Sequence, residues 1–197
     1  VFANQMQEAL SKAMGSDGDD AQSQGLSLDE ILDKYKKFVQ TVAVVSQFDI
    51  NIPLYTALRI SGLEGVTEFS HIYETLLDLP FLSPIEGIDP EGNDSEFMIR
   101  FRTPLEAKLY LEEELQLTPE QEVETIAKLI LAIPRDSWSM YSEARILDHL
   151  IRVIGPNSMI SDPRAKNKIH HYKAYYDKII TALFDLRTKK RVLIPRL

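Results

Sequence analysis

The side chains that could carry out acid–base or metal chemistry are scattered along the chain. The four histidines are His71, His149, His170 and His171. The last two are adjacent, so on a helix they point about 100° apart and cannot readily ligate one metal together. The carboxylates at 112–114 have the pattern of a solvated helix face. Because the chain also lacks phosphate-cradling glycine motifs and a nucleophile elbow, we predict no catalytic residue, no metal site and no cofactor of its own.

Basic residues are concentrated near the C-terminal end. Residues 158–197 hold ten Lys and Arg against three Asp and Glu, although the whole chain has a net charge of −8. Arg187, Lys189, Lys190 and Arg191 are therefore candidate nucleic-acid contacts. Few aromatic residues interleave with them, which argues against single-strand stacking. The favoured alternative is a basic helical tail packed beside an acidic body.

Three tyrosines in the same tail are candidates for binding a protein partner. Tyr172, Tyr175 and Tyr176 lie at helical spacing and share an apolar stripe with Ile179 and Ile180. Such a stripe could form a partner groove. The favoured alternative is packing between helices.

The clearest structural signal is a strand that runs directly into a helix. Apolar and polar residues alternate over Glu96–Arg102, as in a half-buried strand. Thr103 then suits the N-cap, Pro104 the first helical position and Glu106 the capping box. The same logic, applied along the chain, predicts a mainly α protein with one β-hairpin formed by 81–88 and 96–102. The predicted helices are 2–14, 28–46, 53–60, 67–77, 104–115, 118–132, 142–154 and 168–186.

This order of elements divides the chain into three parts. Residues 1–26 form a helix and a flexible acidic loop, and residues 27–103 form a winged-helix-like module of three helices plus a hairpin. Residues 104–197 form a helical bundle or the lead-in to a solenoid. In a DNA-reading winged helix the third helix enters the major groove, but here it carries Glu68 and Glu74 and no basic residue. We therefore consider nucleic-acid binding the least favoured function.

Composition limits the location of the protein. There are no cysteines, and no apolar run approaches the 18 or so residues that a membrane-spanning helix requires. We expect a cytoplasmic protein without membrane contact. Because the chain begins with Val1 rather than Met, we also expect it to be a piece of a longer protein.

Several hydrophobic patterns carry a family resemblance. They are Tyr35–Ser46, Phe48–Pro53, Leu54–Arg59, Phe101–Leu109, Ile154–Asn157, the predicted helix that runs to Leu186 and Arg187, and Ile194–Leu197. The block 28–111 resembles the region that follows the nucleotide-binding core in bacterial STAND-class P-loop NTPases, signal-transducing ATPases that include antiviral sensors. The tail is similar to their run into a tetratricopeptide-like sensor.

The resemblance implies a role for the strand–helix junction. In such proteins a histidine after the wing often senses the bound nucleotide, and the matching position falls at or near Thr103, beside Arg102. This chain has threonine there, so the alternative is a plain N-cap. ATP and Mg²⁺ would bind to the parent protein and not to this segment.

The function implied by the resemblance is regulatory and non-catalytic. The segment would couple the nucleotide state to a C-terminal sensor and to oligomerisation, with the adjacent NTPase and sensor domains as its partners. A stand-alone helical adaptor that binds other proteins is the first alternative. A winged-helix DNA-binding regulator is the second.

Overall fold

The computed structural model describes residue 8 and residues 28–64, 79–88, 95–132 and 172–189. Within these residues it confirms a mainly α protein, with five α-helices and a small three-stranded antiparallel sheet. No helix in this described part is long and apolar enough to cross a membrane. The elements are α2 (Leu28–Ser46), β1 (Ile52–Pro53), α3 (Leu54–Ser61), β2 (Leu82–Ile88), β3 (Ser95–Phe101), α5 (Pro104–Leu109), a π-helical turn (Tyr110–Glu114), α6 (Pro119–Ala132), a 3₁₀ turn (Lys173–Tyr175) and α9 (Tyr176–Lys189).

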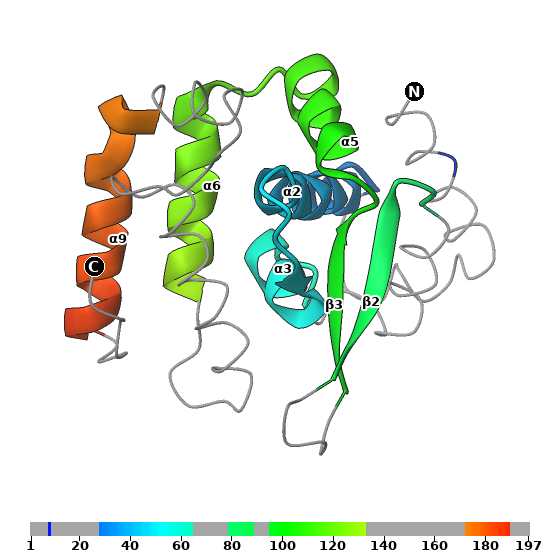
Figure 1. Cartoon of the computed structure of the whole chain (residues 1–197), viewed down its shortest axis with the longest axis horizontal. Helices are drawn as coiled ribbons and strands as arrows, with labels where there is room; N and C mark the ends of the chain where they lie inside the picture. Colours follow the sequence, from blue (N-terminus) through cyan, green and yellow to red (C-terminus); the bar gives the residue numbers. More distant parts are fainter. Residues whose placement is uncertain (1–7, 9–27, 65–78, 89–94, 133–171, 190–197) are drawn as a thin grey trace.

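The elements form successive layers (Figure 1). The sheet lies at one side, α2 and α3 follow in the middle, and α6 and α9 stand side by side at the other side. Of the two outer helices, α6 contacts both α2 and α3, whereas α9 packs mainly against α6. The position of α9 therefore depends on that of α6.

The central element is α2, and its apolar pattern explains why. The predicted helix 28–46 matches its bounds. In its second half Phe38, Val39 and Val42 are fully buried, and so are Ala43 and Val44 on the other sides of the same turns. A helix that is apolar all round must be covered from several directions. This helix accordingly contacts α3, α5, α6, the π-helical turn and β3.

The hairpin is confirmed, and a third strand joins it. β2 pairs with β3 from Leu82 opposite Phe101 to Ile88 opposite Ser95. β1 pairs with the other edge of β3, so the strand order is β1-β3-β2. The sequence prediction missed β1, because two residues are too few to show an alternating pattern. Pro53, predicted to be the first helical residue, instead ends β1 and occupies the N-cap of α3.

The predicted helix ends are largely confirmed. The Thr103 hydroxyl accepts a hydrogen bond from the Glu106 amide at 3.2 Å and caps α5, with Pro104 at the first helical position. Gly62 ends α3 in the left-handed conformation, with φ of 73°. The predicted helix 104–115 changes to π-helical geometry after Leu109. Its last turn is thus wider than the sequence pattern indicated.

The C-terminal helix needs two corrections. It was predicted over 168–186, but α9 begins at Tyr176 after a 3₁₀ turn and continues to Lys189. Ile180 was placed in the buried stripe, yet it is 59% exposed because its neighbour Ile179 occupies the face toward α6. The predicted helices 2–14, 67–77 and 142–154 lie outside the described residues, apart from residue 8.

The buried face of β3 gives a direct test of the strand assignment. Phe101 is 1% exposed and its ring lies 5.4 Å from that of Phe81 and 5.5 Å from that of Tyr110. We expect Phe101→Ala to lower the free energy of unfolding by about 3–5 kcal/mol. Phe97→Ala, on the same strand but 40% exposed, is the matched control and should cost clearly less in urea unfolding. Equal losses for the two variants would contradict the deeper burial of Phe101 relative to Phe97.

Candidate functional site

A buried polar cluster lies where α2, α6 and the start of the C-terminal helix meet. It consists of Gln47, Glu122 and Tyr172, which we call the interhelix cluster. The Tyr172 hydroxyl donates to Oε2 of Glu122 at 2.5 Å, and the Gln47 side-chain amide donates to the same oxygen at 2.7 Å. Glu122 is 2% exposed and Tyr172 is fully buried. Residues separated by 50 to 125 positions in the sequence are therefore joined through one carboxyl oxygen.

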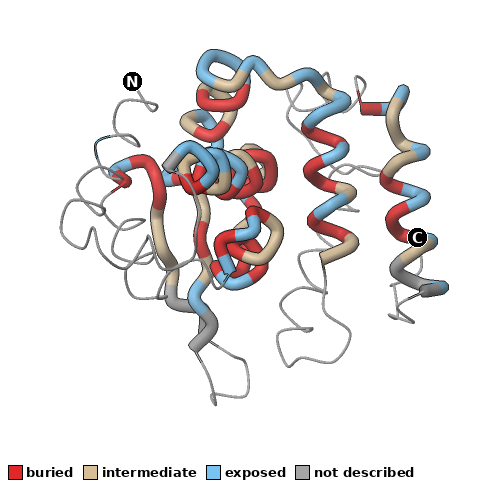
Figure 2. The backbone as a smooth tube through the Cα atoms, turned by 180° about the vertical axis from the view of Figure 1, so that it is seen from behind, coloured by how far each residue is buried: buried red, intermediate tan, exposed pale blue. Residues whose placement is uncertain are grey.

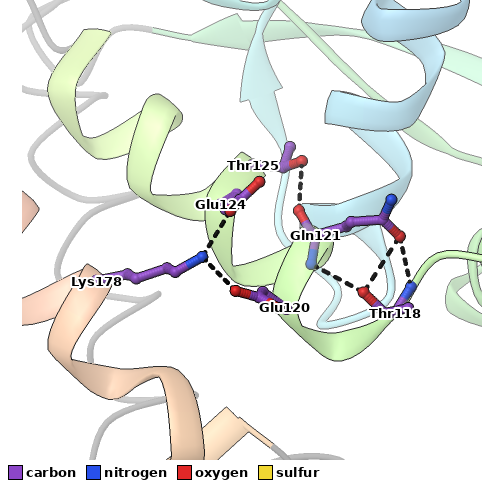
Figure 3. A network of polar contacts seen from close by, with 6 residues as sticks. All are labelled: Thr118, Glu120, Gln121, Glu124, Thr125 and Lys178. Carbon is purple, nitrogen blue, oxygen red and sulfur yellow. Dashed lines mark hydrogen bonds and ion pairs between the residues drawn. The ribbon is translucent and has the colours of Figure 1, made fainter.

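Local structure explains how each of the three side chains reaches the cluster. α6 begins with a reciprocal capping box, in which the Thr118 amide donates to Oε1 of Gln121 and the Gln121 amide donates to the Thr118 hydroxyl (Figure 3). This cap fixes the first turn, which carries Glu122. Gln47 directly follows the last residue of α2, and Tyr172 directly precedes the 3₁₀ turn. Each member thus stands at the end of an element, where a small rotation would separate the groups.

Two members of the cluster, Glu122 and Tyr172, are buried away from water, whereas Gln47 is half-buried. The ring of Phe48 meets that of Tyr172 edge-on, with 6.2 Å between the ring centres. Burial raises the pKa of the Tyr172 phenol, and the neighbouring carboxyl of Glu122 raises that pKa further. The phenol therefore remains protonated near neutral pH and keeps its donor role. Because Glu122 and Tyr172 are enclosed in this way, their hydrogen bonds are suited to fixing the alignment of the elements rather than to reaching a substrate.

Further side-chain contacts hold α6 against the middle layer. The Gln40 side-chain amide donates to the Thr125 hydroxyl at 3.0 Å, which links α2 to α6. The guanidinium of Arg59 donates to the Ala132 carbonyl at the end of α6 and lies over the ring of Tyr55. α6 is thus tied to α2 at its middle and to α3 at its end.

On the outer side of α6, an ion-pair cluster holds α9. Nζ of Lys178 lies 2.7 Å from Oε1 of Glu120 and 2.6 Å from Oε1 of Glu124 (Figure 3). The hydrogen bond from Lys178 lowers the pKa of the Glu124 carboxyl, and those to Glu120 and Glu124 raise the pKa of the Lys178 ammonium. Because the two glutamates are one turn apart, a single lysine contacts both.

The candidate nucleotide-sensing residues lie apart from the candidate residues in the tail. Arg102 and Thr103 are exposed at the junction of β3 and α5. The Thr103 side chain caps α5 there. Both views place this junction and α9 on different sides of α6 (Figures 1 and 2). The structure therefore does not bring the two predicted groups of site residues together.

The candidates in the tail have different environments. Tyr172 belongs to the interhelix cluster, whereas Tyr175 and Tyr176 are half-buried and pack against the core. Burial also raises the pKa of Tyr176. Of the nucleic-acid candidates, the side chains of Arg187 and Lys189 in α9 and all of Lys190 and Arg191 lie outside the described residues. In β3, Arg100 pairs with Asp49 at 3.2 Å.

Sequence reasoning missed Gln47 and Glu122. The only available signal was a glutamate on the apolar side of a predicted helix, since Glu122 adjoins Val123 and precedes Ile126 by four residues. In the part of the chain that the structure describes, no group of three or more His, Asp or Glu side chains could hold a metal ion.

Comparison of the chain with protein-family models, curated proteins and solved structures finds no match. The proposal for function therefore depends on the contacts described above.

Removal of one hydroxyl tests the importance of the interhelix cluster. We expect Tyr172→Phe to lower the free energy of unfolding by about 1–3 kcal/mol, because the buried carboxyl oxygen of Glu122 loses a donor. Tyr175→Phe removes a hydroxyl from a half-buried ring and serves as the control. Its cost should stay within about 0.5 kcal/mol in urea unfolding. A neutral Tyr172→Phe would show that the cluster does not stabilise the fold.

The Lys178 ion pairs predict a pH dependence. A carboxyl whose pKa is lowered in the folded state stabilises that state above its unfolded pKa, and this contribution is lost as the pH falls through the folded value. The difference in free energy of unfolding between wild type and Lys178→Met should therefore be present near neutral pH. It should decrease as the pH falls below 4.5, the ordinary pKa of glutamate. Urea midpoints measured across this range give the result. A difference that stays constant well below 4.5 would contradict the assignment of Glu124 as the partner of Lys178.

Proposed function

We propose that this chain is a non-catalytic regulatory segment of a STAND-like NTPase, which couples the nucleotide state to a C-terminal sensor and to oligomerisation. The observation that carries the proposal is the interhelix cluster. It joins Gln47, directly after the central helix α2, to the buried Glu122 of α6 and to the buried Tyr172, which precedes the 3₁₀ turn that leads into α9. Such a contact suits a segment that transmits a change in alignment from one side to the other.

The physical basis is the directionality of buried hydrogen bonds. Apolar side chains tolerate small shifts of one helix against another, but a buried donor or acceptor is satisfied only in a narrow range of positions. Separation of Gln47 and Tyr172 from Glu122 would leave a buried carboxyl without two of its donors. A cost of about 1–3 kcal/mol for each unsatisfied group is similar in size to typical coupling free energies between ligand sites.

The outer pair supports the proposal in a second way. α9 contacts the rest of the described structure mainly through α6, and Lys178 holds it there with two exposed ion pairs. A movement of α6 would therefore carry α9 with it. We infer that α6 and α9 move as a unit relative to α2.

The test uses the protein expressed from its complete gene. We expect ATP, compared with ADP, to change its assembly state in analytical ultracentrifugation. Glu122→Gln keeps the shape of the side chain but places an amide opposite the Tyr172 hydroxyl and the Gln47 amide, and it should abolish this nucleotide dependence. Glu113→Gln, a charge change at an exposed position of the π-helical turn, should leave it intact. No nucleotide effect in the wild type would contradict the STAND-like assignment. An unchanged effect in Glu122→Gln would remove the interhelix cluster from the mechanism.

A stand-alone helical adaptor remains the second candidate function. Exposed apolar side chains on α9 favour it, because contiguous apolar surface marks sites of protein contact. A protein that assembles with a partner but ignores nucleotide in the same assay would support this alternative.

A further inference from the structure

α9 is apolar on two of its faces. Ile179, Ala182 and Leu183 are buried on the face toward α6. Ile180 and Phe184 stand one turn apart on another face, where they remain 59% and 64% exposed. α9 is also the outermost of the described layers (Figures 1 and 2). In stacked helical arrays the terminal helix has a polar outer face. α9 instead exposes apolar side chains on its outer side, as expected of a helix that another helix covers.

The exposed residues form one continuous stripe along the helix. From the 3₁₀ turn onward its members follow one another at intervals of four, three, four and four residues, which keeps them on one side. All five are exposed, with charged residues at the N-terminal end, apolar residues in the middle and threonine last. We call this stripe the outer face of α9. It consists of Lys173, Asp177, Ile180, Phe184 and Thr188.

We propose that the outer face of α9 docks an amphipathic helix from the sensor part of the same polypeptide, which forms the next layer of the stack. This inference depends on the proposed function, because the sensor belongs to the parent protein. Two apolar side chains at i and i+4 form the type of ridge that fits a groove of a second helix. Lys173 and Asp177 call for an acidic and a basic residue at the facing positions of that helix.

The size of the apolar surface favours an attached helix over a second copy of the chain. A large aromatic side chain offers about 150–250 Å². With the exposed fractions given above, Phe184 and Ile180 together present on the order of 200 Å². A stable interface between separate proteins buries roughly 800 Å² on each partner. A patch of this size therefore cannot compensate for the lost freedom of a separate partner, but it suffices for a helix held nearby by the chain.

The absence of cysteine allows a direct test. Phe184→Cys, or Ile180→Cys as a second variant, places a single thiol on the outer face in the protein expressed from its complete gene. Glu113→Cys gives a solvent-exposed reference thiol in the same background. We expect a maleimide reagent to modify Cys at 184 about tenfold more slowly than Cys at 113, at every protein concentration. The additional substitution Lys173→Glu places a negative charge opposite the acidic residue expected on the docked helix. Because the two charges repel, this substitution should reduce the protection of the thiol.

Two outcomes of the labelling overturn the docked helix. Equal rates at 184 and 113 would show that nothing covers the outer face. Protection that increases with protein concentration would identify a second copy as the occupant. The labelling is measured without nucleotide, so it is independent of the assembly assay. An unprotected thiol in a protein that still assembles with ATP would reject the docked helix alone, and a protected thiol in a protein that ignores nucleotide would reject the STAND-like function alone.

Discussion

The burial of α2 is the constraint on which the other elements depend. Its second half presents apolar side chains in every direction, and Phe38, Val39, Val42 and Val44 have no exposed surface. Burying one such side chain is worth about 1.5–3 kcal/mol, so leaving any side of this helix uncovered would be costly. The sheet, α3, α5 and α6 each cover part of it. Their positions follow from the need to enclose one helix, and contacts between them, such as that of α3 with α6, add to this arrangement.

Apolar packing of this kind fixes which elements meet but specifies their alignment less strictly. The interhelix cluster fixes the alignment of α6 at the end of α2, because Gln47 and Tyr172 both donate hydrogen bonds to Glu122 there. At the other end of α6, the Arg59 guanidinium donates to the carbonyl of Ala132, the last residue of the helix. The outer pair is thus attached to the apolar centre by the apolar packing of α6 and, in addition, by polar contacts at both ends of α6. This division of roles is the structural basis for the proposed coupling.

The elements with strong local signals were predictable from the sequence. The bounds of α2, the hairpin, the Thr103 cap and α6 all follow from periodicity and capping, which depend on residues close in sequence. The short strand β1 was missed because it has two residues and is defined by its pairing with β3, which is distant in the sequence. The π-helical turn was missed because it continues a helical pattern without a break. The interhelix cluster was only partly visible. Tyr172 stood out as an aromatic residue in an apolar stripe, but its partners lie 50 and 125 residues away, and no local pattern links them.

A double-mutant cycle between Gln47→Met and Tyr172→Phe tests most directly whether the interhelix cluster connects the centre to the outer pair. The two side chains share the Glu122 oxygen, so removing one changes the environment of the other. Urea unfolding of the wild type, both single variants and the double variant yields the interaction energy. Our account predicts a value of at least about 0.5 kcal/mol. Additive effects, within about 0.3 kcal/mol, would show that the two residues act independently and would contradict the account.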